Sequence, residues 1–376
     1  MARFKWKHYI NYIVIFTVAL LFAILSLTGN VSLGNQLLLE KIAIAIVLAV
    51  SLGMVVGFLG ELSLGHAGFM CVGAYIGGKI AAMIDMDASN HLVLIVTMLI
   101  GGLAAAVCGF IIGLPALRLK GDYLAIVTLA FGEIVRSLFL NSSEGSFGAT
   151  LGLKTPRYES SFLFIYGFGV VLIALAVIQN IIRSKHGRAI TAIRDNEIAA
   201  KATGINVTKY KLIVFIVSAF FAGVAGVLFS HANYNVRSQI FDYNYSIEIL
   251  VIVVLGGMGN INGAIISATL ITFLNEQLGT ILTGELALLK DLLYALILIL
   301  LVIYNNAPAL KTFRQKYNLR NLWRKIFKPS NDPGARRDDE AAWDRVPTKI
   351  SMDEVLSTDL KPGNEFTPDK PKGGQE

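Results

Sequence analysis

The chain has 376 residues, of which 55% are hydrophobic and 16% charged, with a mean hydropathy of +0.62 and a formal net charge of +7. A soluble domain of this size does not reach such apolarity, so the composition excludes a soluble enzyme and indicates a polytopic membrane protein. Basic residues gather at the ends of apolar segments, so the excess positive charge indicates membrane topology rather than a nucleic-acid partner.

Apolar segments separated by short polar stretches fill most of the chain. A transmembrane helix needs about 20 mainly apolar residues, and these segments approach or exceed that length. Basic residues before the first segment place the N-terminus inside. Glu40 and Lys41, near the start of the second, are expected to pair or to extend toward the interface. The predicted spans in the first half are 9–28, 36–59, 62–84, 92–117, 122–140 and 161–182.

The third predicted span is rich in glycine around two polar residues. Ser63 and His66 alternate with Gly65 and Gly68, and glycines at this density allow close helix packing or a break beside a cavity. Polar side chains are costly in a membrane, so these four residues are candidates for a translocation pathway. The alternative is that His66 hydrogen-bonds a neighbour and locks two helices together.

The fifth predicted span carries Thr128, Glu133 and Arg136 at membrane depth. Thr128 and Glu133 are further candidates for the translocation pathway. Glu133 and Arg136 are three residues apart on a helix and can also pair with each other, which explains both charges without a substrate.

A polar island interrupts the apolar segments in the middle of the chain. Residues 183–211 contain seven Lys or Arg against two acidic residues, which predicts that loop 183–209 lies inside. Six predicted crossings from an inside N-terminus lead to the same side.

The island is expected to contain a short helix that ends near Thr203. Asp195 or Asn196 can cap its first turn, Glu197 complements the positive end of its dipole, and Gly204 ends it in the left-handed conformation. Such a helix can lie close against another protein, or it can be an amphipathic helix resting on the membrane. The small residues expected on its surface are Ala199, Ala200 and Ala202.

After the island the sequence predicts a span over 210–232, whose regularly spaced small residues favour close helix packing. The apolar run 246–275 is interrupted by Gly256, Gly257 and Gly259. We therefore expect two shorter segments or a re-entrant pair, with these glycines beside the translocation pathway. A last span over 287–304 completes nine or ten membrane segments in an all-α bundle.

The chain divides into two parts by composition. Residues 1–307 form the predicted transmembrane domain, including loop 183–209. Residues 308–376 hold 14 of the 33 basic and 11 of the 26 acidic residues and lack hydrophobic periodicity. They are expected to form a cytoplasmic tail that is basic at first and then largely disordered.

Four segments resemble a known transporter family. Residues 197–204 resemble the E-A-A-three residues-G loop of ABC importer permeases, with Ile198 in place of the first alanine. Three others resemble the permeases of branched-chain amino-acid importers, and all four occur in the family's order between about residues 40 and 300. The three segments are 61–69, 117–133 and 254–263.

The resemblance implies a permease subunit of an ATP-driven importer of leucine, isoleucine and valine in a prokaryotic inner membrane. Its implied partners are a second permease, two ATPase subunits, an external binding protein and membrane lipid. The chain is then no enzyme and has no catalytic or metal-binding residues. It binds no cofactor, because ATP and Mg are used by the ATPase. The residues implied in coupling to the ATPase are Asp195, Glu197, Ala199, Ala200 and Gly204.

Three alternatives remain at this point. Permeases for urea or short amides resemble those for branched-chain amino acids. An ion-coupled carrier working alone needs a buried acid for its ion, and the candidates are Glu133, Glu248 and Glu276. A receptor or scaffold is disfavoured by the many glycines at membrane depth.

Overall fold

The computed structural model describes residues 10–27, 32–84, 86, 88, 90–119, 121–158, 160–282 and 289–306. The predicted tail 308–376 and the basic N-terminal residues lie outside these ranges. The helices and strands, in chain order, are α1 (Ile10–Leu27), α2 (Leu33–Gly53), the π-helix η2 (Met54–Leu59), α3 (His66–Ile84), α4 (His91–Ala116), α5 (Asp122–Leu140), α6 (Glu144–Phe147), η3 (Ala149–Leu151), β1 (Leu153–Lys154), α7 (Ser160–Arg183), α8 (Lys185–Asp195), α9 (Glu197–Ala202), α10 (Val207–Ala232), β2 (Asn235–Val236), η4 (Ser238–Ile240), α11 (Tyr243–Gly256), α12 (Ile261–Ile281) and α13 (Lys290–Asn306).

The described residues contain ten apolar helices. Seven are long and apolar enough to cross a membrane, namely α2 with η2, α3, α4, α5, α7, α10 and α12. The apolar parts of α1, α11 and α13 are shorter. Each predicted span coincides with one of these helices, which confirms a polytopic helical protein. The number of crossings stays a prediction.

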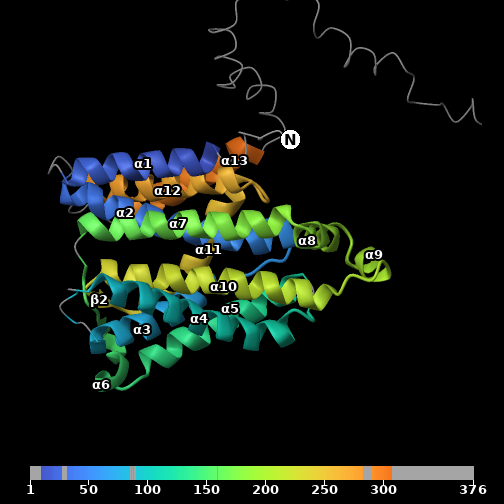
Figure 1. Ribbon diagram of the computed structural model, residues 1–376, viewed down its shortest axis with the longest axis horizontal. Coiled ribbons are helices and arrows are strands. Elements are labelled where there is room, and N and C mark those ends of the chain that lie inside the picture. The colour runs from blue at the N-terminus through green and yellow to red at the C-terminus, as the bar shows by residue number, and fades with distance from the viewer. Residues whose placement is uncertain are drawn as a thin grey trace, which may run out of the picture. The chain divides into compact units, whose positions relative to one another are not determined.

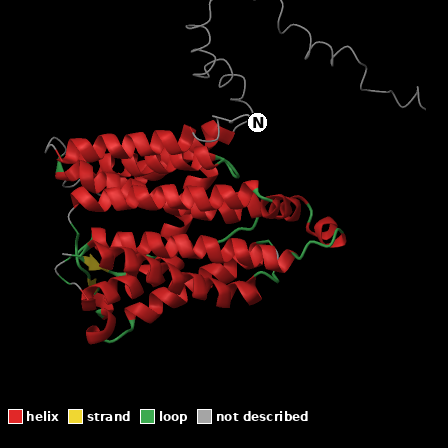
Figure 2. Ribbon diagram, in the orientation of Figure 1, coloured by secondary structure: helices red, strands yellow, loops and turns green. Residues whose placement is uncertain are grey.

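The long helices lie side by side, with α8 and α9 at one end of the bundle and β1 and β2 at the other (Figures 1 and 2). The centre is α2, which is almost entirely buried and packs against α7, α10, α11 and α12. Two-residue strands β1 and β2 pair antiparallel through Leu153 and Val236. The all-α prediction did not include this small pair of strands, because segments this short leave no periodicity to recognise.

Small residues bring α10 against α3 and α4, as the spacing in 210–232 predicts. A Cβ at Gly73 of α3 would overlap the backbone of Gly223, and a Cβ at Gly226 would overlap the Met70 carbonyl. The facing backbones leave no room for side chains, so close packing between these helices requires glycine at both surfaces.

Two breaks interrupt the helices at the end of the bundle that carries α8 and α9. The first is the coil 60–65 between η2 and α3, so the third span begins at His66 rather than near residue 62 as predicted. The second is the turn between α11 and α12, where Gly257 and Gly259 have φ values of +89° and +81°. This turn confirms the predicted division into two segments, although α12 continues beyond residue 275 to Ile281.

The π-helix η2, directly before the first break, touches the second break. A Cβ at Gly57, in the π-helix, would overlap the backbone of Gly259 in the α11–α12 turn. Two irregular segments far apart in the sequence are therefore held in backbone contact. Irregular backbone within membrane segments is tolerated where the surrounding protein satisfies it.

Candidate functional site

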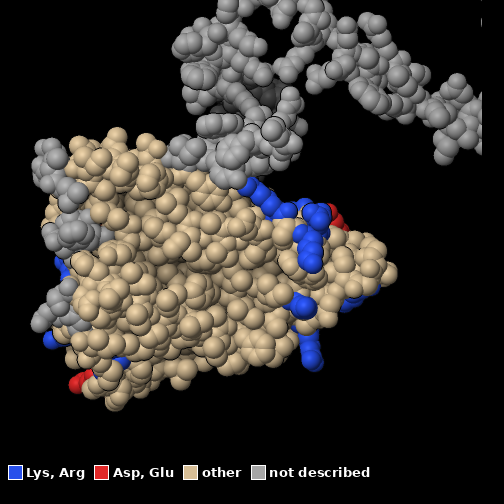
Figure 3. Space-filling model, viewed as in Figure 1, with Lys and Arg blue, Asp and Glu red and all other residues tan. Residues whose placement is uncertain are grey.

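The polar island folds into two helices, α8 and α9, which extend beyond the ends of the long helices (Figure 1). The sequence predicted only the second. The longer α8 is amphipathic, with Ile190 and Ile193 buried against the bundle. Lysine and arginine side chains gather at this end of the molecule in Figure 3. The island is therefore a folded, basic unit rather than a simple loop.

Helix α9 has well-formed caps at both ends. The Asn196 side chain accepts hydrogen bonds from the backbone N–H groups of Ile198 and Ala199, both at 3.0 Å, so Asn196 is the N-cap. Gly204 has φ +84° and donates to the Lys201 carbonyl, while the Ile205 N–H donates to the Ala200 carbonyl. This pattern is the Schellman motif, which confirms the predicted stop at Gly204.

The outward face of α9 consists of one large apolar residue among small ones. Ile198 is 75% exposed, and Ala199 and Ala202 are also exposed. Ala200 is only 4% exposed, so its predicted place on the surface is wrong. The reason is geometric, because a short helix that packs on the bundle must turn one side inward. Asp195 ends α8 and pairs with Arg194 at 3.1 Å.

A chain of ion pairs joins α9 to the membrane helices. Glu197 contacts Lys201 of its own helix at 2.7 Å and Lys211 of α10 at 3.2 Å. Lys211 is almost fully buried and also pairs with Glu61 in the coil before α3. A buried ammonium is tolerable only when it is paired, and two carboxylates from different segments supply that pairing here.

The charges around Glu197 keep it ionised. Its hydrogen bond from Lys201 is the largest effect and lowers the pKa of the Glu197 carboxyl; partial burial opposes this, and Lys211 lowers the pKa further. The ion pairs of Glu197 are therefore present at neutral pH.

Arg194 of α8 makes a second link to the helix breaks. Its Nη1 donates to the Gly57 carbonyl at 3.1 Å, at the π-helix where regular hydrogen bonding is interrupted. Its aliphatic stem fills the space beside Gly60, where a Cβ would overlap Arg194 Cγ. Because Gly57 touches Gly259, Arg194 connects α8 to both breaks.

Sequence reasoning did not identify Lys211 or Glu61 as parts of this site. The available signal was a lysine one residue inside the predicted span 210–232. A charge at that depth needs a counter-charge, but only the folded chain shows which carboxylates supply it.

The residues predicted for a translocation pathway lie mainly at helix junctions. His66 is buried, and its Nε2 is 2.9 Å from the Ser51 hydroxyl of α2, a contact that favours the helix-locking alternative. The Leu64 N–H donates to the Thr128 hydroxyl at 3.0 Å. Gly65 faces Thr128 and Gly68 faces Gly132 of α5, so these residues share one packed junction.

The remaining candidates occupy other places in the bundle. Glu133 pairs with Arg136 at 2.8 Å, as the spacing predicts, and also accepts a hydrogen bond from the Tyr243 N–H at the start of α11. Gly256 packs on Gly263 beside the turn formed by Gly257 and Gly259. Ser63 Oγ is buried without a hydrogen-bond partner among the described residues.

Comparison with known proteins gives consistent matches along the bundle. The family described as "Branched-chain amino acid transport system / permease component" matches residues 36–302. The chain is 34% identical over 338 residues to the high-affinity branched-chain amino acid transport system permease protein LivM of Escherichia coli, covering 82% of this chain and 77% of that protein. LivM of Salmonella typhimurium is 36% identical over 293 residues, covering 70% and 68%.

More distant relatives include the permease protein LivH of the high-affinity branched-chain amino acid transport system of Salmonella typhimurium. It is 25% identical over 275 residues, covering 68% of this chain and 88% of that protein. No solved structure gives a significant match.

Proposed function

Because the chain belongs to the family of branched-chain amino acid transport system permease components, we propose that it is the membrane-spanning subunit of an ATP-driven importer of leucine, isoleucine and valine. The main support for the proposed mechanism is helix α9, which is capped and exposed and is joined by ion pairs to α10 and to the coil before α3.

Helix α9 is the element that docks on a partner ATPase. Its outward face offers Ile198 as an apolar anchor between the small residues Ala199 and Ala202, which allow close approach. An aliphatic side chain that becomes buried in an interface contributes to affinity through the apolar area removed from water. ATP and Mg are used by the ATPase, and two copies of it serve two permeases.

The contacts of α8 and α9 give a route for coupling. A displacement of these helices moves Lys211 through Glu197 and the π-helix through Arg194, and therefore acts on the contact between Gly57 and Gly259. Alternating access requires contacts that differ between two states, and these polar contacts can exchange without unfolding a helix.

The other partners and the orientation follow from the relatives and the charge distribution. LivM and LivH are both named as permease proteins of a high-affinity branched-chain amino acid transport system, and both are similar to this chain. This similarity supports a second, related permease as a partner. An external binding protein delivers the substrate. Basic residues in 183–211 support an inner-membrane location with the loop on the cytoplasmic side, together with the N-terminus and tail.

Uptake of labelled leucine and of labelled urea tests this proposal. The chain is expressed with its genomic neighbours in cells that lack their own systems for both compounds. Leucine uptake that requires this chain and ATP is expected. Uptake of urea but not of leucine would show that the substrate is urea rather than a branched-chain amino acid. Leucine uptake that persists without the ATPase would contradict the importer mechanism.

A further inference from the structure

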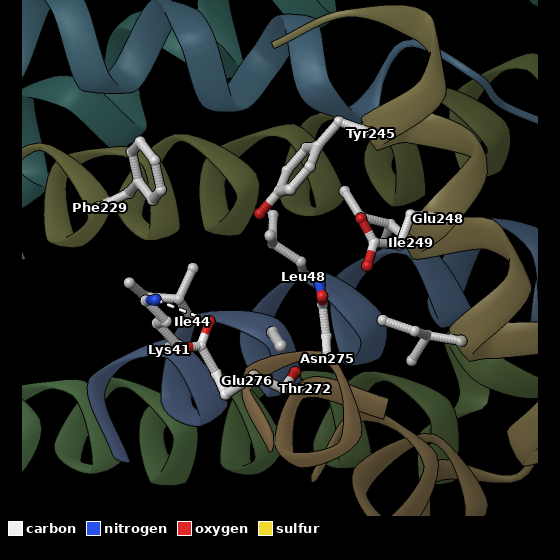
Figure 4. Close-up of a pocket in the computed structure, with 12 residues that line it drawn as sticks. Lys41, Ile44, Leu48, Phe229, Tyr245, Glu248, Ile249, Thr272, Asn275 and Glu276 are labelled. Atoms are coloured by element: carbon white, nitrogen blue, oxygen red, sulfur yellow. Dashed lines mark hydrogen bonds and ion pairs between the residues drawn. The ribbon is translucent and has the colours of Figure 1, made fainter. Parts of the chain in front are cut away.

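A cavity of about 180 Å³ lies between α2, α10, α11 and α12 (Figure 4). Lys41 is eight residues after the start of α2, Glu248 five after the start of α11, and Glu276 five before the end of α12. At 1.5 Å per residue, Lys41 and Glu276 lie about 8 to 12 Å from these helix ends, on the side opposite α8 and α9. Glu248 lies deeper, because α11 begins inside the bundle, where the Tyr243 N–H donates to Glu133, seven residues before the end of α5. None of the pathway residues predicted from the sequence lines the cavity.

Charges of both signs line this cavity. Lys41 Nζ and Glu276 Oε1 form an ion pair of 2.7 Å at its rim, which links α2 to α12. Glu248 accepts a hydrogen bond from the Tyr294 hydroxyl at 2.6 Å through one carboxylate oxygen. Ionisable residues within membrane segments are costly to bury, and three of them around one cavity indicate a functional site.

Several polar atoms face the same space without a partner. Figure 4 shows the Tyr245 hydroxyl, the Glu248 carboxylate and the Asn275 amide directed toward the centre of the cavity. Among the described residues, neither the Tyr245 hydroxyl nor the Asn275 side chain has a hydrogen bond, and the second oxygen of Glu248 is likewise free. Their hydrogen-bonding capacity is available to a ligand.

The rest of the wall is apolar, which restricts the kind of ligand. Branched aliphatic side chains from α2 and α11 surround the polar groups, so a sugar with hydroxyls on every side would leave several of them unpaired. Lys41 disfavours a simple metal cation, and Glu248 disfavours a simple anion. These aliphatic side chains are Ile44 and Leu48 of α2 and Ile249 and Ile252 of α11.

A second cavity adjoins this site on the side toward the end of the bundle. It has a volume of about 220 Å³ and shares Lys41, Ile44 and Phe229 with the first. Its other lining residues include Arg157 and Tyr234 in the segments beyond the long helices. A small molecule that enters from the side opposite α8 and α9 would therefore meet Lys41 first, at the boundary of the two cavities.

We propose that this cavity is a subsite for one zwitterionic amino acid with a branched apolar side chain, which gives the importer proposed above a selective step of its own. The ammonium of the ligand binds Glu248. Its carboxylate binds Lys41, which has three N–H donors and uses one on Glu276, and the Asn275 amide. The aliphatic side chain packs between α2 and α11. This inference rests on the proposed function, because the ligand is the transported one.

Transport by the complete transporter in proteoliposomes tests the polar contacts. With leucine-loaded binding protein and ATP, Glu248→Gln is expected to lower the turnover of leucine by at least about tenfold, since it removes a hydrogen-bonded charge. The concentration of loaded binding protein that gives half-maximal rate stays unchanged. Glu144→Gln, at an exposed acid at the same end of the bundle, is the matched control and keeps the wild-type rate.

Site-specific protection gives a second readout that does not depend on Glu248. In the complete transporter with Cys71→Ala and Cys108→Ala, a water-soluble thiol reagent labels Thr272→Cys, which lines the cavity but makes none of the proposed ligand contacts. Leucine is expected to slow this labelling at least about tenfold. Leucinamide, which lacks the carboxylate, and isocaproate, which lacks the ammonium, are expected to have little effect. Leu151→Cys, exposed at the same end of the bundle, is labelled equally with and without leucine.

The outcomes separate the two proposals. If the wild-type chain takes up leucine but Glu248→Gln keeps the wild-type turnover, or leucine does not protect Thr272→Cys, the subsite is overturned and the importer proposal stands. Equal protection by leucine and leucinamide overturns the zwitterion assignment. Failure of the wild-type chain to transport leucine with ATP overturns the proposed function itself.

Discussion

Among single residues, Lys211 links helix α9 to the membrane helices. Its ammonium lies between Glu61 and Glu197, and replacing it by methionine keeps the length of the side chain but leaves two carboxylates facing each other. We expect Lys211→Met to lower the free energy of unfolding by about 1 to 3 kcal/mol. Leucine uptake should fall more than the ATPase activity of the assembled transporter.

Thermal unfolding and coupled transport assays measure both effects of Lys211→Met. Lys209→Met, two residues earlier on the exposed side of α10, is the matched control and should behave as the wild type. Equal uptake and stability in the two variants would show that the buried ion pairs do not connect α9 to the membrane helices.

Glu197 gives a prediction for pH dependence. Lys201, followed by Lys211, holds the pKa of the Glu197 carboxyl below its ordinary value of 4.5 in the folded protein. The unfolded chain therefore takes up the proton first as pH falls, so the stabilisation is present above about pH 4.5 and is lost below it. Because Glu197 is partly exposed, we expect a small effect.

Thermal unfolding of the wild type and Glu197→Gln at different pH values tests this. The wild type should be the more stable at pH 7, and the difference should shrink as the pH falls below 4.5. A constant difference across this range would contradict the electrostatic explanation.

At the scale of elements, α9 presents one exposed apolar anchor. Ile198→Asp adds a charge at a position that is 75% exposed, so it should leave insertion and folding unchanged. It should weaken co-purification with the ATPase and lower leucine uptake by more than about tenfold. Leu151→Asp, at a residue that is 65% exposed at the other end of the bundle, is the control. Wild-type binding of the ATPase by Ile198→Asp would exclude Ile198 from the docking surface.

The contact between the two helix breaks gives a second prediction at this scale. Gly57→Ala places a methyl group where the backbone of Gly259 already lies, and such overpacking typically costs about 1 to 3 kcal/mol. Transport and the midpoint of thermal unfolding should both fall. Gly34→Ala, in the same run of helix but with open space around it, should be neutral or slightly stabilising. Similar behaviour of the two variants would contradict the close approach.

At the scale of the whole molecule, the transmembrane part contains every contact proposed for coupling and substrate binding. The residues after Ser330 are polar and lack the periodicity of a packed element. Truncation after Ser330 is therefore expected to leave leucine uptake within about twofold of the full chain, measured at equal amounts in the membrane. Loss of assembly with the ATPase would instead identify the tail as a docking element.

The membrane class, the positions of the apolar helices and the capped helix α9 could all be predicted from the amino-acid sequence. These features depend on local composition, because a span needs a run of apolar residues and a helix end needs a capping side chain or a glycine in the left-handed region. The pairing of Glu133 with Arg136 was predictable for the same reason, since both lie three residues apart on one helix.

Which polar residues meet, in contrast, depends on the packing of the folded bundle. Lys211 finds Glu61 and Glu197, Arg194 reaches Gly57, and Glu248 and Asn275 share a cavity with Lys41. The partners in each case come from different helices, whose rotation and depth depend on how the whole bundle packs. No local sequence pattern predicts the rotation or depth of a helix. The sequence therefore indicates that charged residues lie at membrane depth, where they are costly, but not which residues they contact.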